Sequence, residues 1–334
     1  MGQAPQEEYG RLAGYAIREL VGHKKRVNVL AWSCNGRKLA SGSADQSIRI
    51  WAVEQHNQVS RPERSELELK GHSSSVSCLA WRPGTQHDVL ASTTAGDKAD
   101  KTIRIWDVRS GKCSHMLSTS CGNTYLAWSP DGNSFATKNE NDVLTLYDFR
   151  KMRAAKHPYK CVGQVEEILW GPSPGHMLLA TDKGAVDVLS LASMEVLLSL
   201  KGHGGAVYCL AMSKDCKLLA SGGGDGLIAL WDLDTGLCVR SWAHMDHPVR
   251  IMSMSGDGSM LAYATEQNEL EILSVRTGER LQEFKLRMAY CDCVAWNPVA
   301  DVLAYSEEII DPADRSGRGM IGAVYIYAPP KPTA

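Results

Sequence analysis

The sequence predicts an all-β fold: a seven-bladed β-propeller with four antiparallel strands in each blade, formed by residues 15–328 as a single domain. Three observations lead to this prediction: one segment recurs along the chain, each repeat holds four short alternating runs, and the two chain ends complement each other. The recurring segment closes on an aromatic residue or a leucine, namely Trp51, Trp106, Tyr147, Leu189, Trp231, Leu273 and Tyr327. Successive members of this series lie 55, 41, 42, 42, 42 and 54 residues apart. A period near 42 residues, built from short strands, is typical of a propeller.

Each repeat divides into four short runs separated by turn residues. In the first repeat, VNVLAWS (27–33) alternates apolar and polar residues, and the turn CNGRK leads to LASGS (39–43). The recurring segment ADQSIRIWAV (44–53) follows, and ELELKGH (66–72) leads into the next repeat. Alternation with a period of two, bounded by Gly, Asp and Asn, predicts strands.

The chain ends predict how the ring closes. The segment YAIRELVGH (15–23) has the pattern of a fourth run, whereas AVYIYAP (323–329) has the pattern of a third run. We therefore expect the N-terminal strand to complete the last blade and to remove the sheet edges that an open ring would expose. Residues 1–14 and the Pro-rich residues 329–334 are expected to be flexible segments outside the propeller.

Composition excludes several classes of protein. The chain has 36 Lys and Arg against 38 Asp and Glu, so it lacks the overall basic charge of many nucleic-acid-binding domains. No apolar run reaches the roughly 18 residues that span a bilayer, and the N-terminus lacks the apolar core of a signal peptide. Cys78, Cys209 and Cys293 occupy equivalent positions in their repeats, which predicts small buried residues rather than metal ligands. We expect an intracellular protein without metal or cofactor.

Three repeats share a polar pattern. An Asp stands six residues before the closing Trp, and a Gly-His pair precedes the first run of the same repeat. In a propeller blade the His lies in the turn before the first strand and the Asp in the turn before the third, so the two side chains meet. A buried charge needs hydrogen-bonding partners. The expected networks are His23, Ser41, Asp45 and Trp51; His72, Ser92, Asp100 and Trp106; and His203, Ser221, Asp225 and Trp231.

The alternative for these residues is a catalytic Ser–His–Asp arrangement. Three copies in three separate repeats favour a structural role, because an enzyme needs one preorganised site. The sequence also lacks a phosphate-binding loop, a cluster of metal ligands and a nucleophile arrangement that occurs once. We therefore expect no catalytic residues and no enzyme activity.

The segments VLAWSCNGRKLASGSADQS (29–47) and DKTIRIWDVRSGKC (100–113) resemble the WD-repeat β-propeller family. Within that family, residues 126–148, 247–266 and 294–305 are similar to the subunits of this type in the nuclear THO complex. The resemblance implies a noncatalytic interaction scaffold of the transcription–export (TREX) machinery, which couples transcription to mRNA packaging, processing and nuclear export. It implies other THO subunits as partners, especially large helical ones, and through them an RNA helicase and mRNA export adaptors. The alternative is a peptide- or histone-tail-binding adaptor in a chromatin or ubiquitin-ligase complex.

Loops at the rim that carries the Asp and His turns are candidate docking elements. The strands pair with one another within the blades, so the loops are left to bind partners. Three stand out: KKR (24–26), the inserted TTAGDKAD (93–100) and the long insertion 307–322. The two interpretations are solvated loops and a binding site for a protein partner. The candidate partner-binding residues are Lys24, Lys25, Arg26, Asp97, Lys98, Ile309, Ile310, Arg315 and Arg318.

A basic stretch, RKMRAAKHPYK (150–160), is expected at the opposite rim. Basic residues beside an aromatic ring suit contact with RNA phosphates and bases. The stretch equally suits an acidic protein surface or simple solvation, and the overall charge gives the RNA interpretation no support. The residues concerned are Arg150, Lys151, Arg153, Lys156, Tyr159 and Lys160.

Overall fold

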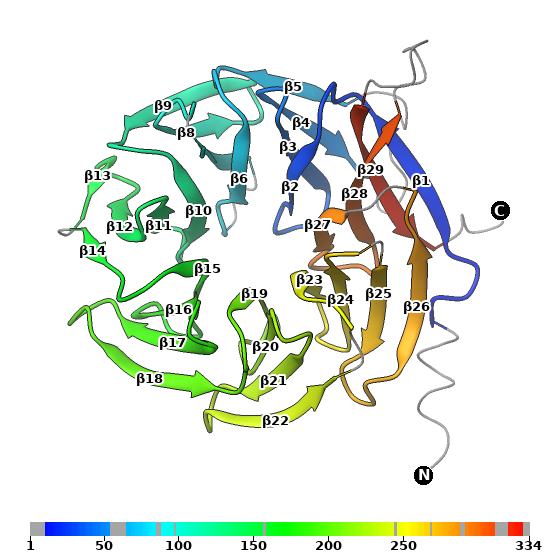
Figure 1. Ribbon diagram of the computed structural model, residues 1–334. Helices are drawn as coiled ribbons and strands as arrows, with labels where there is room; N and C mark the ends of the chain where they lie inside the picture. The colour runs from blue at the N-terminus through cyan, green and yellow to red at the C-terminus, as the bar shows by residue number, and fades with distance from the viewer. Residues whose placement is uncertain are drawn as a thin grey trace.

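Seven antiparallel sheets surround a common axis in the computed structural model of the chain (Figure 1). The structure describes residues 11–53, 65–84, 88–96, 98–155, 158–243, 246–267, 269–287, 291–310 and 320–329. Each sheet forms one blade, and within blades 1 to 6 the strands follow one another from the axis outwards in chain order. The predicted seven-bladed, all-β propeller is therefore confirmed.

The first three blades contain residues 27–160. Blade 1 contains β2 (Val27–Trp32), β3 (Lys38–Ser43), β4 (Ser47–Ala52) and β5 (Leu67–Lys70). Blade 2 contains β6 (Val76–Trp81), β7 (Val89–Thr94), β8 (Thr102–Asp107) and β9 (Lys112–Ser118). Blade 3 contains β10 (Asn123–Trp128), β11 (Ser134–Asn139), β12 (Val143–Asp148), β13 (Arg153–Ala154) and β14 (Tyr159–Lys160).

The next three blades contain residues 165–285. Blade 4 contains β15 (Val165–Trp170), β16 (His176–Thr181), β17 (Ala185–Ser190) and β18 (Val196–Lys201). Blade 5 contains β19 (Val207–Met212), β20 (Leu218–Gly223), β21 (Ile228–Asp232) and β22 (Leu237–Trp242). Blade 6 contains β23 (Val249–Met254), β24 (Met260–Thr265), β25 (Glu269–Ser274) and β26 (Arg280–Lys285).

Blade 7 joins the two ends of the chain, as the sequence predicts. It contains β27 (Cys291–Trp296), β28 (Leu303–Ile310), β29 (Met320–Ala328) and, as its outer strand, β1 (Ala16–Val21). Six residue pairs join β1 to β29, from Ala16 opposite Ala328 to Val21 opposite Ala323. Because the first strand supplies the outer edge of the last blade, the ring is closed by main-chain hydrogen bonds.

The blades pack against one another through apolar faces and a recurring tryptophan contact. The second strand of each blade is almost wholly buried, as in β3 and β24. Tryptophans that end the inner strands of blades 1, 2 and 3 donate their indole N–H to a carbonyl of the preceding inner strand. These bonds join Trp32 to Ala295, Trp81 to Ala31 and Trp128 to Ala80, at 3.0, 2.9 and 3.1 Å. Burial of the indole thus leaves no donor unsatisfied at these three junctions.

The residues just before β1 are fastened to blades 6 and 7. The Arg11 guanidinium donates to both carboxylate oxygens of Asp301, at 2.5 and 2.6 Å, and lies 2.8 Å from the carboxylate of Asp257. Leu12 is 5% exposed and belongs to a core cluster of these blades, and the Tyr327 hydroxyl donates to its carbonyl at 3.4 Å. Within the segment 1–14 that the sequence assigns to a flexible end, Arg11 and Leu12 therefore pack on the propeller.

We expect Arg11→Ala to lower the free energy of unfolding by about 1 kcal/mol, because a half-exposed ion pair with bidentate geometry is lost. Urea denaturation followed by tryptophan fluorescence measures the change. Arg109→Ala, at an exposed turn of blade 2, is the matched control. Equal stability of the two variants would show that the Arg11 contacts do not secure the ring closure.

Candidate functional site

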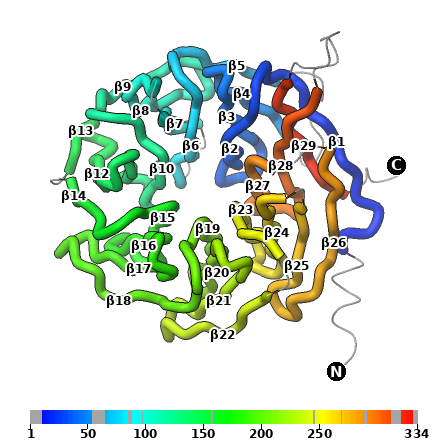
Figure 2. The backbone as a smooth tube through the Cα atoms, viewed as in Figure 1, coloured from blue at the N-terminus to red at the C-terminus, as the bar shows by residue number. Residues whose placement is uncertain are grey.

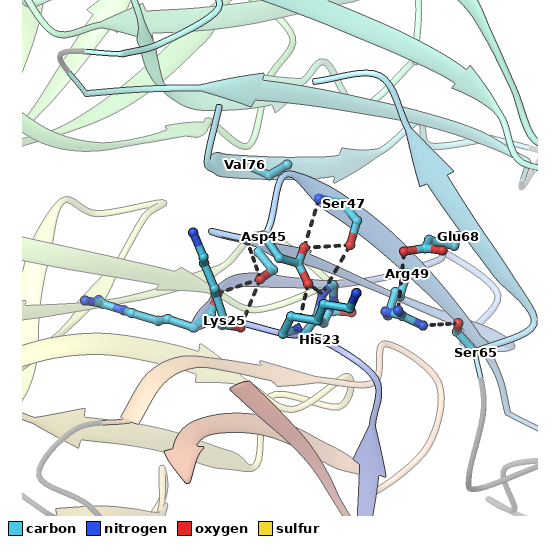
Figure 3. A network of polar contacts seen from close by, with 12 residues as sticks. His23, Lys25, Asp45, Ser47, Arg49, Ser65, Glu68 and Val76 are labelled. Atoms are coloured by element: carbon cyan, nitrogen blue, oxygen red, sulfur yellow. Dashed lines mark hydrogen bonds and ion pairs between the residues drawn. The ribbon is translucent and has the colours of Figure 1, made fainter. Parts of the chain in front are cut away.

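Each of blades 1, 2 and 5 contains a buried chain of hydrogen bonds that links Trp, Ser, His and Asp. In blade 1 the Trp51 indole N–H donates to Ser41 Oγ at 2.9 Å, and Ser41 Oγ lies 2.8 Å from His23 Nε2. The other ring nitrogen of His23 lies 2.9 Å from Asp45 Oδ2 (Figure 3). The structure thus brings together all four side chains of this predicted network.

The same contacts recur in the other two blades. In blade 2 the distances are 2.8 Å from Trp106 to Ser92, 2.7 Å from Ser92 to His72 and 2.6 Å from His72 to Asp100. In blade 5 the corresponding distances are 2.8, 2.8 and 3.1 Å for Trp231, Ser221, His203 and Asp225.

The aspartates tie two loops together. Asp45 accepts the main-chain N–H of Lys24 at 2.9 Å, and it accepts the N–H and hydroxyl of Ser47 at 2.9 and 2.6 Å. Burial would raise the pKa of Asp45, but hydrogen bonds from His23 and Ser47 outweigh burial and hold that pKa well below its usual range. The same balance lowers the pKa of Asp100 to about 2 and also lowers the pKa of Asp225. All three carboxylates are therefore ionised at neutral pH.

The direction of the hydrogen bonds indicates a structural role. A neutral imidazole with its proton on Nδ1 donates to the aspartate and accepts the serine hydroxyl at Nε2, while the serine oxygen accepts the indole N–H. Burial is the main cause of the lowered pKa of His72, partly offset by Asp100, which agrees with a neutral ring. Each indole N–H, serine hydroxyl, imidazole nitrogen and aspartate carboxylate in the three networks then has a hydrogen-bond partner.

The connectivity is that of a hydrolytic triad, but the nucleophile position is inaccessible. The serine hydroxyl must reach a substrate carbonyl in that chemistry. Ser41, Ser92 and Ser221 are each 0% exposed, and each oxygen already accepts an indole N–H. The arrangement can bind loops together and hold the first strand against the third, but it offers no place for a substrate.

The predicted docking residues near the His and Asp turns have different surroundings. Lys24, Lys25, Arg26 and Lys98 are all exposed, and Arg26 in addition forms an ion pair with Asp292 at 2.8 Å. The insertion 307–322 is not a loop along its whole length, because β28 and β29 continue to Ile310 and from Met320. Ile310 is 52% exposed, but Ile309 is 6% exposed and packs in a core cluster, so its assignment to a docking surface was wrong. Asp97, Arg315 and Arg318 lie outside the described residues.

The basic stretch 150–160 is divided between two ends of a blade. Arg153 pairs with Asp148 at one end of β12, whereas Lys160 pairs with Val143 at the other end. Six residues of strand separate these ends by roughly 16 Å. Arg150 and Lys151 are exposed beside Asp148, and Lys156 lies outside the described residues. The expectation of one basic patch was therefore wrong.

Tyr159 does not serve as the stacking platform that the sequence suggested. Its side chain is partly buried and packs against the core cluster between blades 3 and 4. Lys160 donates to the carbonyl of Asn141, which holds it at the turn before β12. Tyr159 is therefore not available to stack on a base.

The inner strands of the blades lie around the central axis (Figure 2). Their residues line a central channel of about 1440 Å³. Equivalent positions on these strands, which we call the inner row, all line it: Val29, Cys78, Tyr125, Glu167, Cys209, Ile251 and Cys293. Glu167 is the one carboxyl group in the row, and burial raises its pKa to about 8. Aligning the repeats would have singled out this residue, because every other row position is apolar, a thiol or tyrosine.

Neither a metal cluster nor a membrane-spanning element is found in the part of the chain that the structure describes. No three His, Cys, Asp or Glu side chains among those residues are grouped to hold a metal ion. The described residues likewise form no helix with the length and hydrophobicity that crossing a membrane requires.

The repeats match a known family. Residues 14–52, 63–107 and 194–232 match the model of the WD domain, G-beta repeat. The β-propeller domain of Cps50 (Swd1) from Myceliophteria thermophila has the same fold, with a TM-score of 0.76 and 18% identity, over 94% of this chain and 99% of that domain.

Two curated relatives extend the similarity along most of the chain. WD repeat-containing protein AAC3 of Dictyostelium discoideum is 29% identical over 88% of this chain and 64% of its own length. THO complex subunit 3 of Arabidopsis thaliana is 38% identical over 303 residues, which are 91% of this chain and 93% of that subunit. The chain therefore belongs to the WD-repeat β-propeller family that includes THO complex subunit 3.

Proposed function

We propose that this protein is the WD-repeat subunit of a nuclear THO complex and acts there as a noncatalytic scaffold. The observation that carries the proposal is the similarity to THO complex subunit 3, which extends over 91% of this chain and 93% of that subunit. The matched region covers most of the propeller, so the proposal rests on similarity along nearly the whole of both chains rather than on one shared repeat.

The buried networks support a scaffold rather than an enzyme. The Ser–His–Asp contacts lie buried inside blades 1, 2 and 5, and their serine hydroxyls are inaccessible to a substrate. Binding then falls to the exposed loops and to the channel, because a propeller presents those surfaces to partners. We take residues 15–328, with Arg11 and Leu12 packed against them, as the functional unit.

The proposed partners are the other THO subunits, especially large helical ones. Through them the protein would meet an RNA helicase and mRNA export adaptors, within the TREX machinery that couples transcription to mRNA packaging, processing and nuclear export. The division of the basic stretch supports protein contacts rather than a continuous RNA-binding surface.

Affinity purification of the tagged full chain from nuclear extract, after nuclease treatment, followed by mass spectrometry, tests the proposal. We expect THO subunits in stoichiometric amounts, because the nuclease removes proteins bridged only by RNA. Recovery of histones or a cullin without THO subunits would instead identify a chromatin or ubiquitin-ligase adaptor and overturn the proposal.

A further inference from the structure

The central channel contains a carboxyl group that has no cationic partner among the described residues. Among the described residues, the charged side chains that line it are Arg26, Glu167, Arg250, Glu266 and Asp292. Arg26 is paired with Asp292 at 2.8 Å, and Arg250 is paired with Glu266. The Arg250 guanidinium also lies 3.9 Å from the ring centre of Tyr208, which fixes it at the channel wall. Both arginines are therefore engaged, and Glu167 remains without a cation.

Glu167 has few partners of its own. Its Oε2 accepts the main-chain N–H of Leu210 at 2.7 Å, and no side chain of the described residues donates to it. The inner-row neighbours Cys78, Tyr125 and Cys209 all have raised pKa values, mainly through burial and further through the charge of Glu167. A carboxylate with a single hydrogen bond in such surroundings is poorly stabilised.

A second carboxyl group of the channel also lacks a partner. One oxygen of Asp292 bonds to Arg26, but Oδ2 is buried and has no hydrogen-bond donor among the described residues. The Asp292 side chain is 4% exposed. Buried acceptors without donors are rare in folded proteins, so this oxygen can still accept a hydrogen bond from a water, an ion or a donor of a bound partner.

We infer that the channel binds a cationic side chain, a lysine or arginine of a partner protein, which pairs with Glu167. The rest of the wall suits the aliphatic part of such a side chain, since Val29, Ile251 and the inner-row thiols line it. A divalent cation is a poorer fit, because Ca²⁺ and Mg²⁺ take six or more oxygen ligands. The described residues hold no group of three acidic, His or Cys side chains that could supply them. This inference does not depend on which complex the protein joins.

Methyl-labelled methionines allow a direct test on the full chain. Met212 and Met252 line the channel, whereas Met116 lies on the outer strand β9 and is 55% exposed. The probes are four acetylated and amidated pentapeptides, Gly-Gly-X-Gly-Gly, with Arg, Lys, Gln or Leu at X. At pH 8.5, where most of the Glu167 carboxyl is ionised, the Arg or Lys peptide should shift the Met212 and Met252 signals saturably and leave Met116 unchanged.

Glu167→Gln should weaken binding of the cationic peptide by about tenfold or more, the usual effect of losing a charged hydrogen bond. Glutamine keeps an acceptor for the Leu210 N–H, so the variant should fold, and a cooperative melting curve with a midpoint no lower than that of the unaltered protein verifies this. Glu166→Gln, one residue away and outside the channel lining, is the matched control and should bind like the unaltered protein. The inference would be overturned by Gln or Leu peptides that bind as tightly as the Arg and Lys peptides, by the absence of any shift at millimolar concentration, or by unchanged affinity of Glu167→Gln for the cationic peptides.

Discussion

Asp100→Ala is expected to lower the free energy of unfolding by about 2–4 kcal/mol, because it leaves buried donors without an acceptor. The carboxylate accepts from His72 at 2.6 Å and from the main-chain N–H of Ser73 at 3.2 Å. It also accepts the hydroxyls of Thr94 and Thr102, each at 2.8 Å. Urea denaturation measures the loss. Asp107→Ala, at a partly exposed aspartate that ends β8, should show a clearly smaller effect.

The difference in unfolding free energy between the unaltered protein and Asp100→Ala should decrease as the pH is lowered. The folded pKa of Asp100 is about 2, below the value near 3.9 of an unfolded chain. Its contribution is therefore fully present above about pH 4 and is lost as the pH falls through the folded pKa. A difference that stayed constant down to pH 2 would show that the ionised carboxylate is not what holds the two loops together.

Glu167→Gln is expected to stabilise the protein at alkaline pH by up to about 4 kcal/mol. Burial raises the folded pKa of Glu167 to about 8, whereas an unfolded glutamate titrates near 4.3. A group with a raised folded pKa favours folding fully below the unfolded pKa, and this contribution is lost as the pH rises through the folded pKa. Glutamine cannot ionise, so the variant avoids that loss.

Urea titrations between pH 5 and pH 9 measure this effect. The gap between variant and unaltered protein should widen from pH 5 to about pH 8 and then remain constant. The neighbouring Cys78 and Tyr125 stay neutral in this range, because the pKa of Cys78 is raised to about 11 and that of Tyr125 lies well above 10. Glu166→Gln is the control and should follow the unaltered protein. A gap that does not change with pH would mean that Glu167 titrates like an ordinary surface carboxylate.

The features that the sequence predicted are those whose partners lie within one repeat. His72, Ser92, Asp100 and Trp106 fall within 34 residues, and the same spacing pattern recurs in two other blades. Repetition therefore revealed both the strands and the contacts. The closure by β1 was also predictable from the repeat pattern. The last repeat ends with its third run, and the N-terminal segment 15–23 has the pattern of the missing fourth run.

The features that the sequence missed depend on neighbours from other blades. Arg11 contacts Asp301, which lies 290 residues away, and no pattern within a repeat indicates that pairing. The position of Glu167 in the inner row follows from its place in the repeat, but its surroundings come from the neighbouring blades, which supply Tyr125 and the Leu210 N–H. The basic stretch was misjudged because β13 and β14 divide the outer strand of blade 3, which carries Arg153 and Lys160 to opposite ends.

The central claim is that the buried networks hold the propeller together while its surface and channel bind partners. The most direct test combines thermal unfolding of Asp225→Ala with its affinity purification from nuclear extract, carried out well below the melting temperature. Asp225 accepts from His203 and from the main-chain N–H of Gly204 at 2.7 Å, so the account predicts a lower melting temperature and an unchanged set of THO subunits. An unchanged melting temperature together with loss of those subunits would contradict it.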